Sequence, residues 1–83
     1  MAEQNTFHLV VASVGETFFD GAALSATLPT QGGEITVLPH HEPLVSTLKA
    51  GKITVRTTID QPREFTVESG VLEVSDNRAV VLL

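Results

Sequence analysis

The residues with the widest chemical repertoire gather in one short segment, His40-His41-Glu42, which Pro39 and Pro43 bracket. Imidazole and carboxylate groups are common metal ligands, so this segment is a candidate cation site. Neighbouring side chains of an extended loop point in opposite directions, however, and do not converge on one ion. Because each proline also restricts the backbone, the sequence favours a stiff polar loop in which His41 hydrogen-bonds to backbone. A metal site at His40, His41 and Glu42 remains the alternative.

Other reactive side chains do not form a recognisable active site. Nucleophilic catalysis needs a Ser, Thr or Cys beside a base, and no serine lies in a glycine-flanked strand-to-helix turn. Glu64 and Glu68 fall on one face of an expected strand, about 13 Å apart, which is too far for a glycosidase carboxylate pair. Gly32-Gly33 lacks the Lys-Ser/Thr of a phosphate loop and is typical of a hairpin turn. The residues therefore favour a non-catalytic binding or structural module.

Length and composition narrow the function further. The 83 residues fit one domain, 1–83, and leave no room for a two-domain enzyme. The chain has no cysteine, which excludes disulfides and thiolate metal sites. Its net charge is -5 and its five Lys and Arg are scattered, so we expect no nucleic-acid partner. No apolar run approaches the roughly 20 residues of a membrane span, and no signal-peptide pattern is present.

The elements that must position these residues are expected to be strands. Val, Ile and Thr account for 24 residues, and β-branched side chains favour extended, half-buried backbone. Apolar and polar alternation predicts extended segments over 6–14, 17–21, 22–28, 34–38, 44–48, 51–59, 63–68, 71–75 and 78–83. Turns are expected at Asp20-Gly21, at 29–33, at 60–62 and, as a two-residue hairpin loop, at Asp76-Asn77. The sequence therefore predicts an all-β sandwich or barrel.

The alternation also predicts which side chains face the core. In the first strand, Phe7, Leu9 and Val11 share one face, and His8, Val10 and Ala12 share the other. In the later strands the inward positions are Ile35 and Val37, then Ile53, Val55, Thr57 and Ile59, then Phe65 and Val67. The first strand is apolar on both faces, so we expect it to be covered from two sides. The adjacent Phe18 and Phe19 are expected to face opposite ways.

The most specific segment is residues 33–51, GEITVLPHHEPLVSTLKAG. It resembles the signature of the epsilon subunit of F-type ATP synthase (delta in mitochondria). Members of that family carry Gly-Glu-hydrophobic-Gly-hydrophobic-x-Pro-Gly-His-x-Pro-Leu and then a Leu-Lys-x-Gly turn. Residues 7–11, 19–21, 65–74 and 77–81 support the resemblance, which is collinear over nearly the whole chain.

The resemblance implies a flattened ten-stranded β-sandwich at the foot of the rotary central stalk, in contact with the gamma subunit and the c ring. The implied role is mechanical: the domain helps to couple proton-driven rotation of the c ring to ATP synthesis in other subunits. It would have no catalytic residue and no cofactor. It would associate with the membrane only through the complex, at the cytoplasmic face of a bacterial inner membrane or on the stromal or matrix side in an organelle. The alternative is a stand-alone β-sandwich binding module, with or without metal at the His40/His41/Glu42 loop.

The resemblance also suggests partner-contact residues. Glu34 and His41 match family positions that face the polar loops of the c ring, and His40, Glu42 and Pro43 belong to the same loop. The surface that faces gamma is not assigned by any motif.

Three departures from the family pattern affect these expectations. His40 replaces a Gly, so if that Gly has a positive φ, the loop here must either differ in backbone or carry strain. Thr36 replaces a second Gly, a tolerable change in a strand. The family's C-terminal helical pair, which inhibits ATP hydrolysis and in some species binds ATP, does not follow the strand at 78–83. We therefore expect neither property, and the apolar run at 80–83 predicts a final sheet strand or a chain cut before a further segment.

Overall fold

The computed structural model describes residues 5–58 and 61–83, and the regular secondary structure of those residues consists of nine β-strands. The strands are β1 (Phe7–Ser13), β2 (Glu16–Ala23), β3 (Ser25–Thr30), β4 (Gly33–Val37), β5 (Leu44–Leu48), β6 (Gly51–Arg56), β7 (Arg63–Val67), β8 (Gly70–Ser75) and β9 (Arg78–Leu82). No helix in the described part of the chain is long and apolar enough to cross a membrane. The all-β class is confirmed, although the resemblance implies ten strands.

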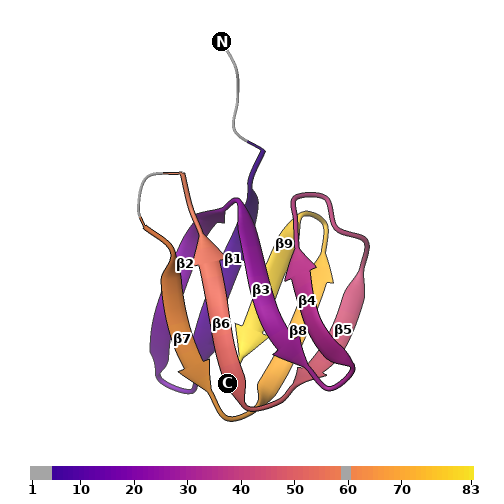
Figure 1. Ribbon diagram of the computed structural model, residues 1–83. Helices are drawn as coiled ribbons and strands as arrows, with labels where there is room; N and C mark the ends of the chain where they lie inside the picture. Colours follow the sequence, from indigo (N-terminus) through magenta and orange to yellow (C-terminus); the bar gives the residue numbers. More distant parts are fainter. Residues whose placement is uncertain (1–4, 59–60) are drawn as a thin grey trace.

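The strands form one curled sheet that folds into two facing layers (Figure 1). One layer has the order β2-β1-β9-β8-β5, and the other contains β4, β3, β6 and β7. The layers join at a corner where Thr30 of β3 pairs with Leu48 of β5. β1 and β9 run parallel, whereas the other paired strands are antiparallel. This arrangement is the predicted β-sandwich.

The predicted turn at Asp20-Gly21 is wrong. β2 continues through both residues, which pair with Val10 and Leu9 of β1. Because the antiparallel ladder between β1 and β2 runs past both residues, its backbone hydrogen bonds override the local preference of Asp-Gly for a turn. The strand expected over 22–28 consequently begins only at Ser25, after the chain has crossed between layers.

The other predicted turns are nearly correct. The expected loop at 29–33 shortens to Gln31 and Gly32, because β3 extends to Thr30 and β4 begins at Gly33. Asp76 and Asn77 form the predicted two-residue loop, and their φ angles of 52° and 58° are those of a type I′ hairpin turn. The predicted strand end at Ile59 and turn residue Asp60 lie outside the described residues.

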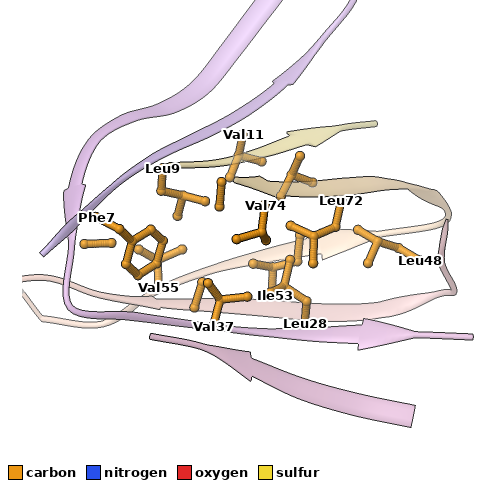
Figure 2. Packing of buried hydrophobic residues seen from close by; sticks show 14 of the residues in the cluster. Phe7, Leu9, Val11, Leu28, Val37, Leu48, Ile53, Val55, Leu72 and Val74 are labelled. Atoms are coloured by element: carbon orange, nitrogen blue, oxygen red, sulfur yellow. The ribbon is translucent and has the colours of Figure 1, made fainter. Parts of the chain in front are cut away.

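The core lies between the two layers and is built almost entirely of aliphatic side chains (Figure 2). Its buried hydrophobic members are Phe7, Leu9, Val11, Ala23, Ala26, Leu28, Val37, Leu48, Ile53, Val55, Val67, Leu72, Val74, Ala79 and Val81. Ile35 and Phe65 are half-buried and pack against this cluster. The predicted inward positions are therefore confirmed where the structure describes them, except that Thr57 is only half-buried.

A β-bulge overturns the prediction for the two adjacent phenylalanines. Val11 pairs with Phe19, whereas the next residue, Ala12, pairs with Thr17, so Phe18 is an extra residue in β2. An extra residue interrupts the alternation of side chains along a strand. Phe18 and Phe19 consequently both pack against the core cluster.

Candidate functional site

The 39–43 loop joins β4 to β5 and begins with a tight turn. The His41 amide donates a hydrogen bond of 3.1 Å to the Leu38 carbonyl, which places Pro39 and His40 at the two central positions of the turn. His40 has a φ of 63°. Proline followed by a residue with positive φ defines a type II turn, whose second central position normally holds glycine.

The sequence left two alternatives for a histidine in place of this glycine, a different loop backbone or a strained one. The positive φ of His40 shows the strained backbone. A left-handed conformation costs a residue with a side chain about 1–2 kcal/mol. The His40 N–H donates to Oδ1 of Asn77, in the β8–β9 hairpin, at 2.7 Å.

The hydrogen bond predicted for His41 is confirmed. The half-buried His41 ring donates from Nδ1 to the Glu42 carbonyl at 2.7 Å, and because a carbonyl can only accept, Nδ1 carries a proton. This contact orients the ring within its own loop. It also removes Nδ1 as a metal ligand, since a coordinating nitrogen must offer a free lone pair.

The rest of the loop is open to solvent. His40, Glu42 and Pro43 are exposed, and the apolar Leu38 beside them is 54% exposed. The loop therefore presents polar and apolar groups together on a backbone held by two prolines and three hydrogen bonds. That combination suits a contact with another protein more than it suits catalysis.

Glu34 is not brought together with the loop. It is exposed near the start of β4, opposite Pro29, whereas the loop follows the other end of that strand. Strand rise separates Glu34 from Leu38 by about 13 Å. Glu34 and His41 thus occupy opposite ends of β4.

The metal-binding alternative finds no ligand set in the described residues, where no three His, Cys, Asp or Glu side chains gather into a group that could hold an ion. His8 pairs instead with Asp20 on the neighbouring strand, with Nε2 and Oδ1 2.5 Å apart. Glu64 pairs with Lys52 at 3.8 Å on the solvent side, as expected for an ordinary surface charge.

An exposed apolar face is the largest feature that the sequence reasoning missed. Val45, Val71 and Leu82 are 70%, 42% and 57% exposed and point outward from the neighbouring strands β5, β8 and β9. Val80 and Leu82 pair with Val10 and Ala12, so the same face continues onto β1. We call these six residues the apolar face. The first strand is thus covered on its inner side, while its outer side joins a surface open to solvent.

The outer surface of the opposite layer is polar. Thr27 and Thr36 face each other across β3 and β4 with their hydroxyl oxygens 3.0 Å apart, and Thr54 pairs with Thr27 from β6. Val45 and Val80 flank the exposed Glu73, so the apolar face carries one carboxylate. A largely apolar surface on only one side of a small sandwich is typical of an interaction site. The signal was present in the sequence: Val45, Val71 and Val80 alternate with residues that are themselves apolar or small.

Comparison with known families gives one match along most of the chain. Residues 6–83 match the family described as the beta-sandwich domain of the ATP synthase delta/epsilon chain. The ATP synthase epsilon chain of Delftia acidovorans is 38% identical over 79 residues, covering 94% of this chain and 56% of the relative. That of Polaromonas naphthalenivorans is 37% identical over the same length and coverage. The chain thus spans little more than half the length of the curated relatives it matches.

Solved structures share the fold. A chain of the Euglena gracilis mitochondrial ATP synthase, in a structure containing OSCP, F1 and the c-ring, superposes with a TM-score of 0.87 at 21% identity. It covers 94% of this chain and 50% of its own length. A chain from the central stalk and c-ring of the Tetrahymena thermophila mitochondrial ATP synthase gives a TM-score of 0.77 at 15% identity, covering 98% and 65%.

Proposed function

We propose, since the chain belongs to the ATP synthase delta/epsilon β-sandwich domain family, that it is a non-catalytic part of the rotor. In this role it couples rotation of the c ring to ATP synthesis by binding both the gamma subunit and the c ring. The observation that carries the proposal is the family match over residues 6–83. The protein reaches the membrane surface only through the complex, on the side where the catalytic sector lies.

The 39–43 loop is the proposed contact with the c ring. Its type II turn, its prolines and the His41–Glu42 hydrogen bond give it a fixed shape. A stiff element transmits torque with less loss than a mobile one, because less of the rotation is spent on deforming it. His40, His41, Glu42 and Pro43 form this contact, and Glu34 adds a second contact from the other end of β4.

The apolar face is the proposed contact with gamma. It offers aliphatic side chains on adjoining strands of one layer, where a folded protein partner can exclude water over a broad area, and one exposed carboxylate, Glu73, between Val45 and Val80 for a polar contact. In this proposal the c ring binds the polar 39–43 loop and gamma binds the apolar face, so each partner has a chemically different surface.

Reconstitution tests this function directly. The chain is added to F1 and c rings from a bacterial ATP synthase stripped of its own epsilon chain to measure co-elution, and to vesicles that hold the complete enzyme without its epsilon chain to measure ATP-driven proton pumping. We expect the chain to bind F1 and to raise pumping. A correctly folded chain that binds neither gamma-containing F1 nor the c ring would overturn the proposal.

Exposed carboxylates allow a sharper test of the loop. Glu42→Gln and Glu34→Gln remove one charge each from opposite ends of β4, and both should lower pumping severalfold while leaving gamma binding intact. Because both side chains are exposed, the free energy of unfolding should shift by no more than about 0.5 kcal/mol. Glu64→Gln, on the polar outer surface, is the matched control and should leave pumping unchanged.

A further inference from the structure

Asn77 connects three segments that are far apart in the sequence. Its main-chain carbonyl accepts from the His8 N–H at 3.2 Å, and its Nδ2 donates to the Thr6 carbonyl at 3.0 Å. Its Oδ1 accepts from the His40 N–H at 2.7 Å, across 37 positions of the sequence. One side chain thus ties the 39–43 loop to the start of β1 and to the β8–β9 hairpin.

The hydrogen bond from the His40 N–H to Asn77 holds the Pro39–His40 peptide, whose orientation distinguishes a type I turn from a type II turn. Types I and II differ by a flip of the central peptide, here the one between Pro39 and His40, and proline is accepted at the first central position of both. A residue with a side chain at the second position favours type I, since type II demands a positive φ. The flip that relieves His40 would turn its N–H away from Oδ1. Asn77 therefore opposes the relaxation that His40 would otherwise favour.

We infer that Asn77 is a positioning residue, which selects the type II form of the 39–43 loop and, in a role that rests on the proposed function, holds that loop in the shape its partner binds. A glycine at position 40 would adopt positive φ without help. With histidine there, the conformation depends on a side chain from a distant hairpin. The loop shape and the β8–β9 turn are consequently linked.

Substitutions in the β8–β9 hairpin separate the effect of the Asn77 side chain on the 39–43 loop from the effect of the Asn77 backbone on the hairpin turn. Asn77→Gly keeps the left-handed backbone of the turn, because glycine tolerates positive φ, but removes both side-chain hydrogen bonds. Asn77→Asp keeps an oxygen for the His40 N–H and loses only the donor to Thr6. Asp76→Gly is the matched control, since Asp76 occupies the other left-handed position of the same turn.

Nuclear magnetic resonance of the chain reads the loop conformation without any partner. A type II turn gives a strong Overhauser effect between Pro39 Hα and the His40 amide proton, and a type I turn does not. In Asn77→Gly we expect this signal to weaken and exchange of the His40 amide to accelerate about tenfold, the loss of one hydrogen bond. Asn77→Asp and Asp76→Gly should retain the signal, and His40→Gly should restore it to Asn77→Gly. An unchanged signal and exchange rate in a folded Asn77→Gly would overturn the inference.

A binding measurement tests the second half of the role. The affinity of c rings for F1 carrying the chain should fall in Asn77→Gly relative to the parent chain. In a His40→Gly background, where the turn no longer needs Asn77, adding Asn77→Gly should lower the affinity no further. A loop that changes conformation with no change in affinity, while Glu42→Gln does weaken binding, would overturn the positioning role. If Glu42→Gln has no effect either, the proposed c-ring contact is wrong, and the resonance experiment alone decides whether Asn77 sets the loop.

Discussion

At the scale of single residues, the most informative position is His40, because its backbone conformation conflicts with its side chain. Its φ of 63° is one that glycine adopts freely and histidine does not. Single-residue strain of this kind persists only where neighbouring contacts enforce it, and such sites are often functional. Here the enforcing contacts are the Leu38–His41 turn and the hydrogen bond from Asn77.

Replacing His40 with glycine should therefore stabilise the domain. Relief of the left-handed strain is worth about 1–2 kcal/mol, and the greater freedom of glycine in the unfolded chain offsets about 0.5–1 kcal/mol. We expect His40→Gly to raise the free energy of unfolding by roughly 0.5–1 kcal/mol in urea denaturation.

Glu42→Gly is the control for this substitution. Glu42 is exposed in the same loop and lacks a positive φ, so glycine there brings only the entropic cost and should destabilise the domain by about 0.5 kcal/mol. Equal effects at positions 40 and 42 would mean that His40 is unstrained.

At the scale of the strands, the sequence predicts what alternation and local turn chemistry determine. The core positions of β4, β6 and β7 and the Asp76-Asn77 turn follow from those patterns. The features that the sequence does not predict depend on strand pairing. β2 stays extended through Asp20-Gly21 because β1 lies beside it, and Phe18 packs against the core because the β1–β2 register shifts. The contact of Asn77 with the loop was missed for the same reason, since no local pattern links residues 37 positions apart.

Strand packing also explains one glycine. A Cβ on Gly70, the first residue of β8, would lie 2.7 Å from the Leu82 carbonyl oxygen and 3.0 Å from Leu83 Cδ2. The backbone of β9 cannot retreat without breaking its pairing, so Gly70→Ala should lower the free energy of unfolding by about 1–3 kcal/mol, measured by thermal or urea denaturation.

Gly32→Ala provides the comparison for Gly70. The nearest atom to a Cβ at Gly32 is Thr30 Oγ1 at 4.0 Å, and its φ is not positive. That substitution should be neutral or stabilising by up to about 1 kcal/mol, because alanine restricts the unfolded chain. A harmless Gly70→Ala would show that β8 and β9 approach less closely at this end.

At the scale of the whole molecule, the two outer surfaces of the sandwich differ in chemistry. The surface of β3, β4 and β6 carries threonines that satisfy one another, as a surface facing water should. The apolar face on the opposite layer leaves Val45, Val71 and Leu82 in solvent. A thin domain gains stability when a partner covers such a surface, because binding to the folded state alone favours folding.

Exchanging valine for threonine on the apolar face isolates binding from folding. Val45→Thr with Val71→Thr keeps the β-branched shape and strand preference, so the free energy of unfolding should change by no more than about 0.5 kcal/mol per site. Each replaced methyl group gives up roughly 1 kcal/mol of apolar burial in a complex, so affinity for gamma-containing F1 should fall roughly tenfold to hundredfold.

Lys52→Gln on the polar surface is the control for this pair and should leave affinity unchanged, since its exposed ion pair with Glu64 contributes little. The c-ring contact should also survive, because the 39–43 loop is untouched. If the double variant binds gamma as tightly as the parent chain but no longer self-associates at high concentration, a second copy of the chain rather than gamma covers the apolar face. The 39–43 loop would then contact the c ring, and the apolar face would join two copies of the chain.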